Sequence, residues 1–183
     1  MMRESDDANA FCVPRASFIR AMRMVASSVT VVTTDGPAGR FGATVSAFSS
    51  VSADPPTILV CLRAESRIAK AVARNGGLCV NVLPDDRQDI ADRFAGLDDH
   101  RLADRFFGID CRGGPGSPPE IDGATVFSGH VEQAVMSGSH RIFICRIRDV
   151  RESAARPLAY LDGSYHNVIP RGACGAGPCA GTA

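Results

Sequence analysis

Features that would assign a function quickly are scarce in this chain of 183 residues. Twenty basic residues balance twenty acidic ones, so no charge excess points to a nucleic acid or an anionic membrane as partner. No apolar run reaches the roughly 18 residues that a bilayer span needs, and residues 1–15 lack the apolar core of a signal peptide. We therefore expect a cytoplasmic protein with reduced cysteines and with no membrane or nucleic-acid partner.

Familiar catalytic motifs are also missing. The sequence has no Walker loop and no Cys-x-x-Cys pair, and its four histidines lie too far apart along the chain for a zinc motif, so we expect no metal. A loose dinucleotide-binding pattern at Gly175-x-Gly177 stands too close to the end to open a helix. Hydride transfer between two bound cofactors is compatible with this scarcity, because the cofactors carry the chemistry.

What the chain does contain is a series of strands. Residues 29–34 are β-branched throughout, and further strands are predicted at 57–62, 78–83, 124–136, 140–149, 157–161 and 164–168. A turn at Asp162-Gly163 joins the last two strands as a hairpin. The strands do not alternate one for one with helices, so a mainly β fold is favoured: an antiparallel β-barrel with inserted helices.

Three short helices interrupt the strands. Apolar residues recur at helical spacing in residues 16–26. Ser66 is a suitable N-cap for a second helix that stops near Asn75 and Gly76. Asp85-x-x-Gln88 resembles a capping box and predicts a third helix that runs to Ala95.

The predicted domain occupies residues 16–169. Residues 1–15 are polar without periodicity, and we expect a flexible segment there. Residues 170–183 are rich in glycine and alanine, which predicts a low-complexity, disordered tail.

A hydroxyl-rich segment, residues 43–52, is the first candidate site. Strict strand alternation would put Thr44, Ser46 and Phe48 on one face. Hydroxyl groups that lead into a barrel interior need hydrogen-bond partners, which a phosphate or a polar heterocycle would supply. A solvated strand face is the alternative explanation.

Two isolated polar residues are further candidates. Asn81 interrupts an apolar strand, so its amide either bonds to a neighbouring turn or contacts a planar heterocycle. His140 follows Gly138-Ser139 at the mouth of another strand. It is either an ordinary rim histidine or a residue that positions a ligand.

An ordered series of short motifs resembles the short-chain flavin reductase family over about residues 16–168. The series comprises residues 29–34 and 42–52, Asp54-Pro55-Pro56, residues 79–83, Phe94-Ala95-Gly96, Asp104-Arg105-Phe106, Gly138-Ser139-His140 and Asp162-Gly163-x-Tyr165. The family includes reductase components of two-component flavin monooxygenases and the NADH:FMN reductases of pyrimidine degradation. A departure is Cys145, at a position where the family often has glycine.

The resemblance implies an FMN-binding split β-barrel and a homodimer with flavin near the subunit interface. By position in the motifs, it implies flavin contacts from Thr34, Thr44, Val45, Ser46, Ala47, Phe48, Ser49, Ser50, Ser52, Asn81, Val82 and Leu83. Ser49, Ser50 and Ser52 would meet the phosphate or ribityl chain, and Asn81 and Val82 the isoalloxazine. His140, as the catalytic candidate, and Tyr165 would lie near the nicotinamide.

The function this implies is NAD(P)H-dependent reduction of FMN, or of FAD, with reduced flavin passed to a partner monooxygenase. A non-catalytic flavin- or haem-binding split-barrel module is the first alternative. The second is a split-barrel oxidase that keeps its flavin tightly, which would need a cluster of basic residues for its substrate phosphate. The sequence leaves the choice between NADH and NADPH open.

Overall fold

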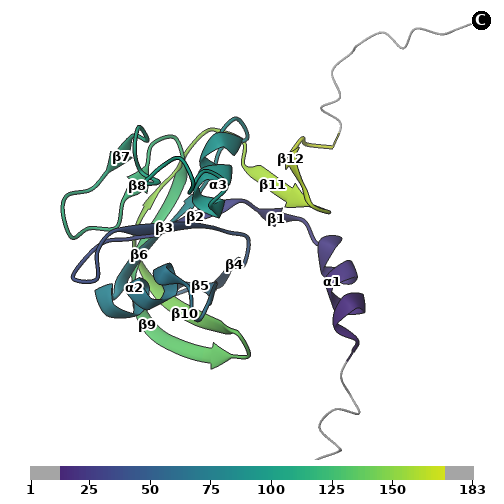
Figure 1. Ribbon diagram of the computed structural model, residues 1–183, viewed down its shortest axis with the longest axis horizontal. Helices are drawn as coiled ribbons and strands as arrows, with labels where there is room; N and C mark the ends of the chain where they lie inside the picture. The colour runs from purple at the N-terminus through teal and green to yellow at the C-terminus, as the bar shows by residue number, and fades with distance from the viewer. Residues whose placement is uncertain (1–12, 172–183) are drawn as a thin grey trace, which may run out of the picture.

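The computed structural model describes residues 13–171 (Figure 1). The predicted flexible segment 1–15 therefore lies mostly outside the described residues, and so does most of the predicted tail 170–183. Among residues 13–171, no helix is long and apolar enough to cross a membrane.

Seven antiparallel strands form the main sheet, in the order β3-β2-β6-β9-β10-β5-β4. The mainly β, antiparallel architecture predicted from the sequence is confirmed. The bounds are β2 Thr30–Thr34, β3 Phe41–Val45, β4 Phe48–Ala53, β5 Pro56–Arg63, β6 Gly77–Val82, β9 Thr125–Ser137 and β10 His140–Arg151.

The two edge strands of this sheet, β3 and β4, are consecutive in the chain and are separated by only Ser46 and Ala47. The expected alternation of Thr44, Ser46 and Phe48 along one strand is therefore wrong. The chain leaves the edge beside β2 at Val45 and joins the edge beside β5 at Phe48, so the pleat does not continue between them.

Strand β2 lies in the centre of the molecule, and all five of its residues are buried. Val31 packs with Phe94 on one side, whereas Val32 packs with Val60 and Phe143 on the other, as strand alternation requires. Two apolar clusters therefore form on the two faces of β2, and together they make the core.

Helix α2 (Arg67–Asn75) ends as the sequence predicts. The Ser66 hydroxyl accepts a hydrogen bond from the Ala69 amide, and Gly76 ends the helix in the left-handed conformation, with φ of 74°. Four apolar side chains of α2 are buried, and the helix packs on β2, β3 and β5.

Helix α3 (Gln88–Ala95) starts later than expected. The predicted capping box at Asp85 is wrong, because the N-cap residue is Arg87 and no side chain caps the helix. The Asp85 amide instead donates to the Arg156 carbonyl, in the connection that runs beside the bridge between Pro84 and Pro157.

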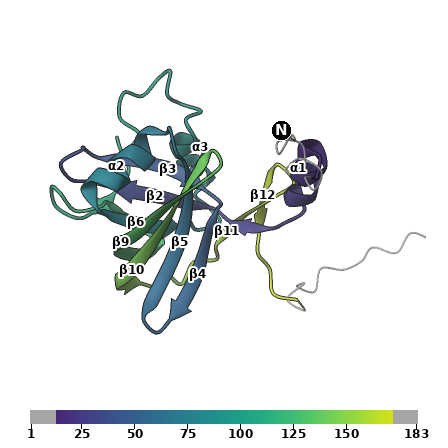
Figure 2. The same cartoon turned by 90° about the horizontal axis from the view of Figure 1, so that it is seen from below.

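An arm projects from the main sheet (Figure 2). It consists of α1 (Arg15–Arg23), β1 (Ser27–Ser28), β11 (Leu158–Leu161) and β12 (Ser164–Asn167), with the strands in the order β1-β11-β12. The predicted turn Asp162-Gly163 joins β11 to β12, and both of its residues have positive φ. No residue of α1 is buried.

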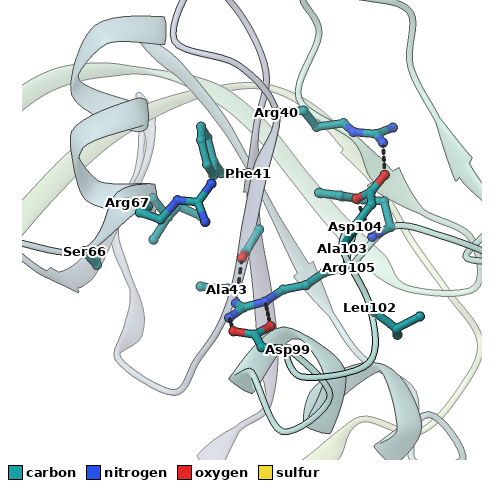
Figure 3. A pocket seen from close by; sticks show the side chains of 13 residues that line it. Arg40, Phe41, Ala43, Ser66, Arg67, Asp99, Leu102, Ala103, Asp104 and Arg105 are labelled. Carbon is teal, nitrogen blue, oxygen red and sulfur yellow. Dashed lines mark hydrogen bonds and ion pairs between the residues drawn. The ribbon is translucent and has the colours of Figure 1, made fainter.

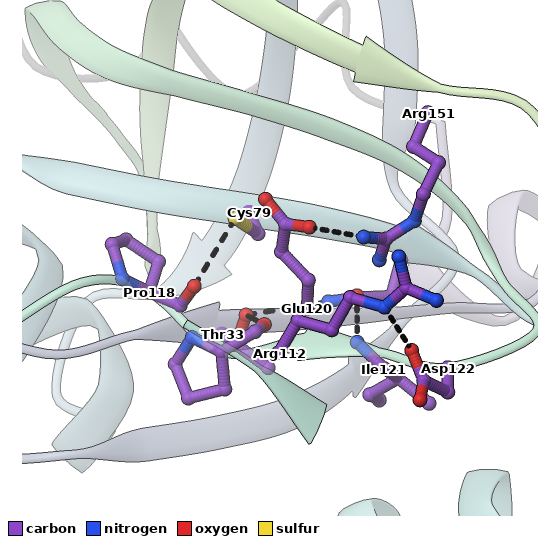
Figure 4. Close-up of polar contacts among 10 residues, drawn as sticks. Thr33, Cys79, Arg112, Pro118, Glu120, Ile121, Asp122 and Arg151 are labelled. Carbon is purple, nitrogen blue, oxygen red and sulfur yellow. Dashed lines mark hydrogen bonds and ion pairs between the residues drawn. The ribbon is translucent and has the colours of Figure 1, made fainter. Parts of the chain in front are cut away.

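A long connection between α3 and β9 carries the short strands β7 (Cys111–Arg112) and β8 (Glu120–Ile121). Residues of the main sheet hold this connection against the sheet (Figure 4). The Thr33 hydroxyl donates to the Pro119 carbonyl, and an ion pair of 2.6 Å joins Glu120 to Arg151. The connection is thereby fixed along β2 and β10.

Candidate functional site

The hydroxyl-rich segment divides into a bonded half and an exposed half. The Thr44 hydroxyl donates to the Ala91 carbonyl of α3 over 2.6 Å. Val45, half-buried, accepts at its carbonyl from the Thr30 hydroxyl. Beyond them Ser46 and Ala47 are exposed. The backbone of the first half is thus fixed, and the second half is open to a ligand.

Strand β4 continues the exposed half. Ser49 and Ser50 are exposed, and Ser52 is half-buried. The hydroxyls of Ser49 and Ser52 bond only to nearby backbone groups, those of Ser50 and Asp54. These local bonds can be exchanged for bonds to a ligand without unfolding the strand.

Asn81 is fully buried, and its amide is occupied by the fold. Its Nδ2 donates to the Val31 carbonyl over 3.0 Å and to the Thr33 hydroxyl, and its Oδ1 accepts from the Ile121 amide over 2.7 Å. Of the two explanations offered by the sequence, the internal hydrogen bonds are the ones observed. The side chain is not free to contact a heterocycle.

Two other expected flavin contacts also lie inside the protein. Thr34 has no exposed surface, and its hydroxyl donates to the Gly77 carbonyl over 2.7 Å. Leu83 is fully buried in the core. Val82, by contrast, is half-buried. The side chains of Thr34 and Asn81 are therefore occupied by the fold, whereas Val82 and Leu83, which line a cavity, stay predicted flavin contacts.

His140 is exposed and opens β10, as expected. Ser139 bonds to its Nδ1 over 3.0 Å, and His140 pairs with Arg63 at the end of β5. The carbonyl of Ser139 accepts from the Ala64 amide. This hairpin therefore lies against the connection between β5 and α2.

Tyr165 lies apart from that connection, on β12 of the arm. Its hydroxyl donates to Asp92 of α3 over 2.9 Å, and its ring lies against Tyr160, with 5.5 Å between the ring centroids. Tyr165 and His140 are thus carried by separate elements, and within residues 13–171 no hydrogen bond or strand pairing links the two.

A cavity of about 450 Å³ lies between β3, the start of α2 and residues 99–106. We call it the arginine cavity, because Arg40, Arg67 and Arg105 line it (Figure 3). Gly42 lies in its wall, and a Cβ atom there would overlap the Phe94 ring. A glycine is therefore needed where β3 passes over α3.

A second cavity, of about 290 Å³, lies near the start of β4 and the end of β6. Phe48, Val82, Leu83 and Phe127 contribute to its wall, and the rings of Phe48 and Phe127 are 5.7 Å apart. Segment 42–48 therefore runs from the wall of the arginine cavity to the wall of this second cavity.

Residues 61–66, which comprise the end of β5 and its connection to α2, bring the candidate residues together. The Cys61 amide donates to the Ala47 carbonyl, the Ala64 amide to the Ser139 carbonyl, and Ser66 begins α2 beside the arginine cavity. Segment 46–48, the His140 hairpin and the arginine cavity are therefore neighbours, although they lie far apart in the sequence.

The sequence did not reveal the arginine cavity, because its charges come from three separate segments. Arg105 stands in the Asp104-Arg105-Phe106 motif, which was the only available signal. Arg67 directly follows the Ser66 cap and had no signal of its own. Within residues 13–171, no group of three or more His, Cys, Asp or Glu residues could hold a metal.

Comparison with known proteins shows which family this chain belongs to. The sequence model of the flavin reductase like domain matches residues 22–168. The chain is 38% identical over 160 residues to the NADH-dependent FMN reductase RutF of Variovorax paradoxus, covering 85% of this chain and 87% of that protein. It is 37% identical over 158 residues to RutF of Pseudomonas syringae, covering 85% and 88%.

Solved structures share the fold. Nitrilotriacetate monooxygenase component B from Mycobacterium thermoresistibile superposes with a TM-score of 0.78 at 29% identity, covering 86% of this chain and 88% of that one. The flavin reductase of styrene monooxygenase from Pseudomonas putida S12 superposes with a TM-score of 0.73 at 26% identity, covering 84% and 98%.

Proposed function

This chain belongs to the flavin reductase like domain family, and from that membership we propose that it is an NADH-dependent FMN reductase. The hydride moves with its electron pair from C4 of the nicotinamide to N5 of the flavin, so NADH is oxidised and FMN is reduced. Such a reaction requires the protein mainly to bring two rings together in the correct orientation.

One structural observation supports the proposal independently of family membership. Exposed Ser46 and Ala47, the His140 hairpin and the arginine cavity all adjoin residues 61–66. A flavin nucleotide needs a polar backbone and hydroxyl surface for its ribityl chain and a cationic surface for its phosphate. Here the exposed backbone of Ser46 and Ala47 and the cationic surface of the arginine cavity both adjoin residues 61–66.

We place the flavin along the segment from Thr44 to Ser52. Ser49, Ser50 and Ser52 offer hydroxyls to the ribityl chain or the phosphate, whereas Ser46 and Ala47 offer exposed backbone. Val45, Phe48 and Val82 supply apolar surface. His140 then orients the nicotinamide or the flavin pyrimidine edge, and no proton transfer by its imidazole is needed. Tyr165, which bonds to Asp92, contributes by fixing the arm.

We further propose that the protein works as a homodimer. The outer face of β10 and β5 carries adjacent apolar residues, because half-buried Leu59 and Cys61 pair directly with half-buried Ile144 and Ile142. Val135, which pairs with Ile142, is 40% exposed. Adjacent apolar residues on an outer sheet face are typical of an interface.

The size of the particle in solution tests the dimer. Light scattering should give the mass of two chains for the wild type. Ile144→Glu places a charge on the apolar face and should shift the mass towards one chain. A wild-type protein that is monomeric and active would contradict the dimer.

Reduced FMN then leaves for a monooxygenase. The support is that structural relatives at 29% and 26% identity are named as reductase components of the nitrilotriacetate and styrene monooxygenases. We place the reaction in the cytoplasm, because Cys61, Cys79, Cys111 and Cys145 are free thiols, which fits a reducing compartment.

Steady-state oxidation of NADH and NADPH, with FMN, FAD and riboflavin in turn, tests this function. The proposal expects fastest oxidation with NADH and FMN. A non-catalytic flavin-binding module would leave the NADH absorbance unchanged with every flavin. A tight-flavin oxidase would retain its flavin through gel filtration, whereas this reductase should release reduced flavin to an acceptor.

A further inference from the structure

The arginine cavity contains an excess positive charge. Three arginines and two aspartates line it. Arg40 pairs with Asp104 over 2.6 Å, and Arg105 pairs with Asp99 over 2.6 Å (Figure 3). Both carboxylates are therefore used, and Arg67 is the guanidinium left over. Within residues 13–171, Arg67 makes no ion pair.

The Arg67 side chain is exposed, and its guanidinium lies over an aromatic ring. Its central carbon lies 5.1 Å from the centroid of the Phe41 ring. A cation over a ring face is attracted by the ring quadrupole, so the side chain is oriented while its N–H groups remain available. The Arg105 hydrogen bond and, to a smaller extent, the Arg67 charge lower the pKa of Asp99. Arg67 lines the cavity and therefore adds its charge to the cavity wall.

The start of α2 adds to this charge. Arg67 is the first residue of a nine-residue helix, and both Arg67 and Ile68 line the cavity. The Arg67 and Ile68 N–H groups have no intrahelical partners, whereas the Ser66 hydroxyl caps the Ala69 amide. The helix dipole makes this end partly positive. Guanidinium and helix terminus thus face the same space, which suits an oxyanion with several acceptor oxygens.

We propose that Arg67 is a specificity-determining residue that binds a substrate phosphate in the arginine cavity. The inference rests on the proposed function, which provides two phosphate-bearing substrates: FMN, through its terminal phosphate, and NADH, through its pyrophosphate. Through Arg67 the protein distinguishes phosphorylated substrates from riboflavin, which has no phosphate. Arg40 and Arg105, already paired, shape the cavity wall.

Calorimetric titration with FMN, riboflavin and ADP-ribose tests the proposal without any turnover. ADP-ribose has the pyrophosphate of NADH but no nicotinamide. Arg67→Gln should weaken binding of FMN or of ADP-ribose by about tenfold or more, as expected for a lost hydrogen bond to a charged group. Riboflavin affinity should stay within about twofold, because no phosphate is involved. The ligand whose binding is weakened, FMN or ADP-ribose, shows which substrate supplies the phosphate.

Arg74→Gln is the matched control. Arg74 lies in the last turn of the same helix, is exposed and does not line the cavity, and its substitution removes the same charge. Arg74→Gln should bind all three ligands as the wild type does. Arg67→Lys keeps the charge and should retain part of the preference for the phosphorylated ligand.

Two results would overturn the proposal. One is an Arg67→Gln protein that binds FMN and ADP-ribose with wild-type affinity. The other is a wild-type protein that binds FMN no better than riboflavin and does not bind ADP-ribose. A third result separates this proposal from the proposed function. If FMN binding depends on Arg67 but the wild-type protein does not oxidise NADH, the proposed reaction is rejected and phosphate recognition by Arg67 stands.

Discussion

The Tyr165 hydroxyl donates a 2.9 Å hydrogen bond to the carboxylate of Asp92 and thereby joins the arm to helix α3. The same helix accepts the Thr44 hydroxyl bond at its Ala91 carbonyl. One helix therefore connects the arm to the first half of the hydroxyl-rich segment. Burial, together with the hydrogen bond to Asp92, raises the pKa of Tyr165 to about 12.

The raised pKa predicts how stability changes at high pH. The folded state favours the neutral phenol, so this stabilisation is complete below the unfolded tyrosine pKa of about 10. It is lost as the pH rises through the folded value of about 12. Tyr165→Phe should therefore lose stability less steeply across this range in urea unfolding.

Phenolate absorbance provides a direct check. The chain has two tyrosines, Tyr160 and Tyr165, so the spectrum contains two phenols. Tyr165→Phe should remove a titration step near pH 12, and Tyr160→Phe should leave that step in place. A late step that persists in Tyr165→Phe would refute the assignment.

Asn81 should matter for stability and not for flavin binding. Asn81→Ala leaves the buried Val31 carbonyl and Ile121 amide without their side-chain partner, at a cost of about 2–4 kcal/mol. The urea midpoint should fall with an unchanged m-value. Asn167→Ala, at an exposed position, is the control and should leave the midpoint unchanged. Folded Asn81→Ala protein with weakened FMN binding would restore Asn81 as a ligand contact.

The strands and α2 could be predicted from the sequence because their signals are local. The Ser66 cap and the Gly76 stop each act within one turn, and Asp162-Gly163 supplies the two positive φ values that its turn requires. The late start of α3 could not be predicted, because the Asp85 amide bonds to Arg156, a partner distant in the sequence.

The candidate site was predictable only in part, for a related reason. A row of hydroxyls in the sequence indicates a polar segment but not which hydroxyls the fold uses itself. The bonds of Thr34 to Gly77 and of Thr44 to Ala91 depend on tertiary contacts. The arginine cavity likewise depends on which arginines find an aspartate, and among its three arginines this leaves Arg67 as the unpaired charge.

The exposed serines of β4 should contribute to flavin affinity. Ser50→Ala should weaken FMN binding by about 1–3 kcal/mol, the usual cost of a lost hydrogen bond to a charged group. Ser49→Ala should act in the same direction, and fluorescence titration with FMN measures both. Ser164→Ala is the control, because Ser164 is an exposed serine on β12 of the arm, and it should bind FMN as the wild type does. Wild-type dissociation constants for both β4 variants would exclude this strand from the flavin site.

His140 should affect the nicotinamide step more than flavin affinity. His140→Ala should lower kcat/KM for NADH by about tenfold or more, equivalent to about 1.4 kcal/mol of transition-state stabilisation. His166→Ala is the control, because His166 is exposed on β12 of the arm. Wild-type kinetics in His140→Ala across the NADH range would make it an ordinary rim histidine.

The central claim is that this chain transfers a hydride from NADH to FMN. Anaerobic rapid mixing of the protein and FMN with NADH tests it most directly, because no oxygen can reoxidise the product. The account predicts that the visible flavin band and the near-ultraviolet NADH band disappear together, one NADH for each FMN, at a rate far above that without protein. Equal rates with and without the protein would contradict it.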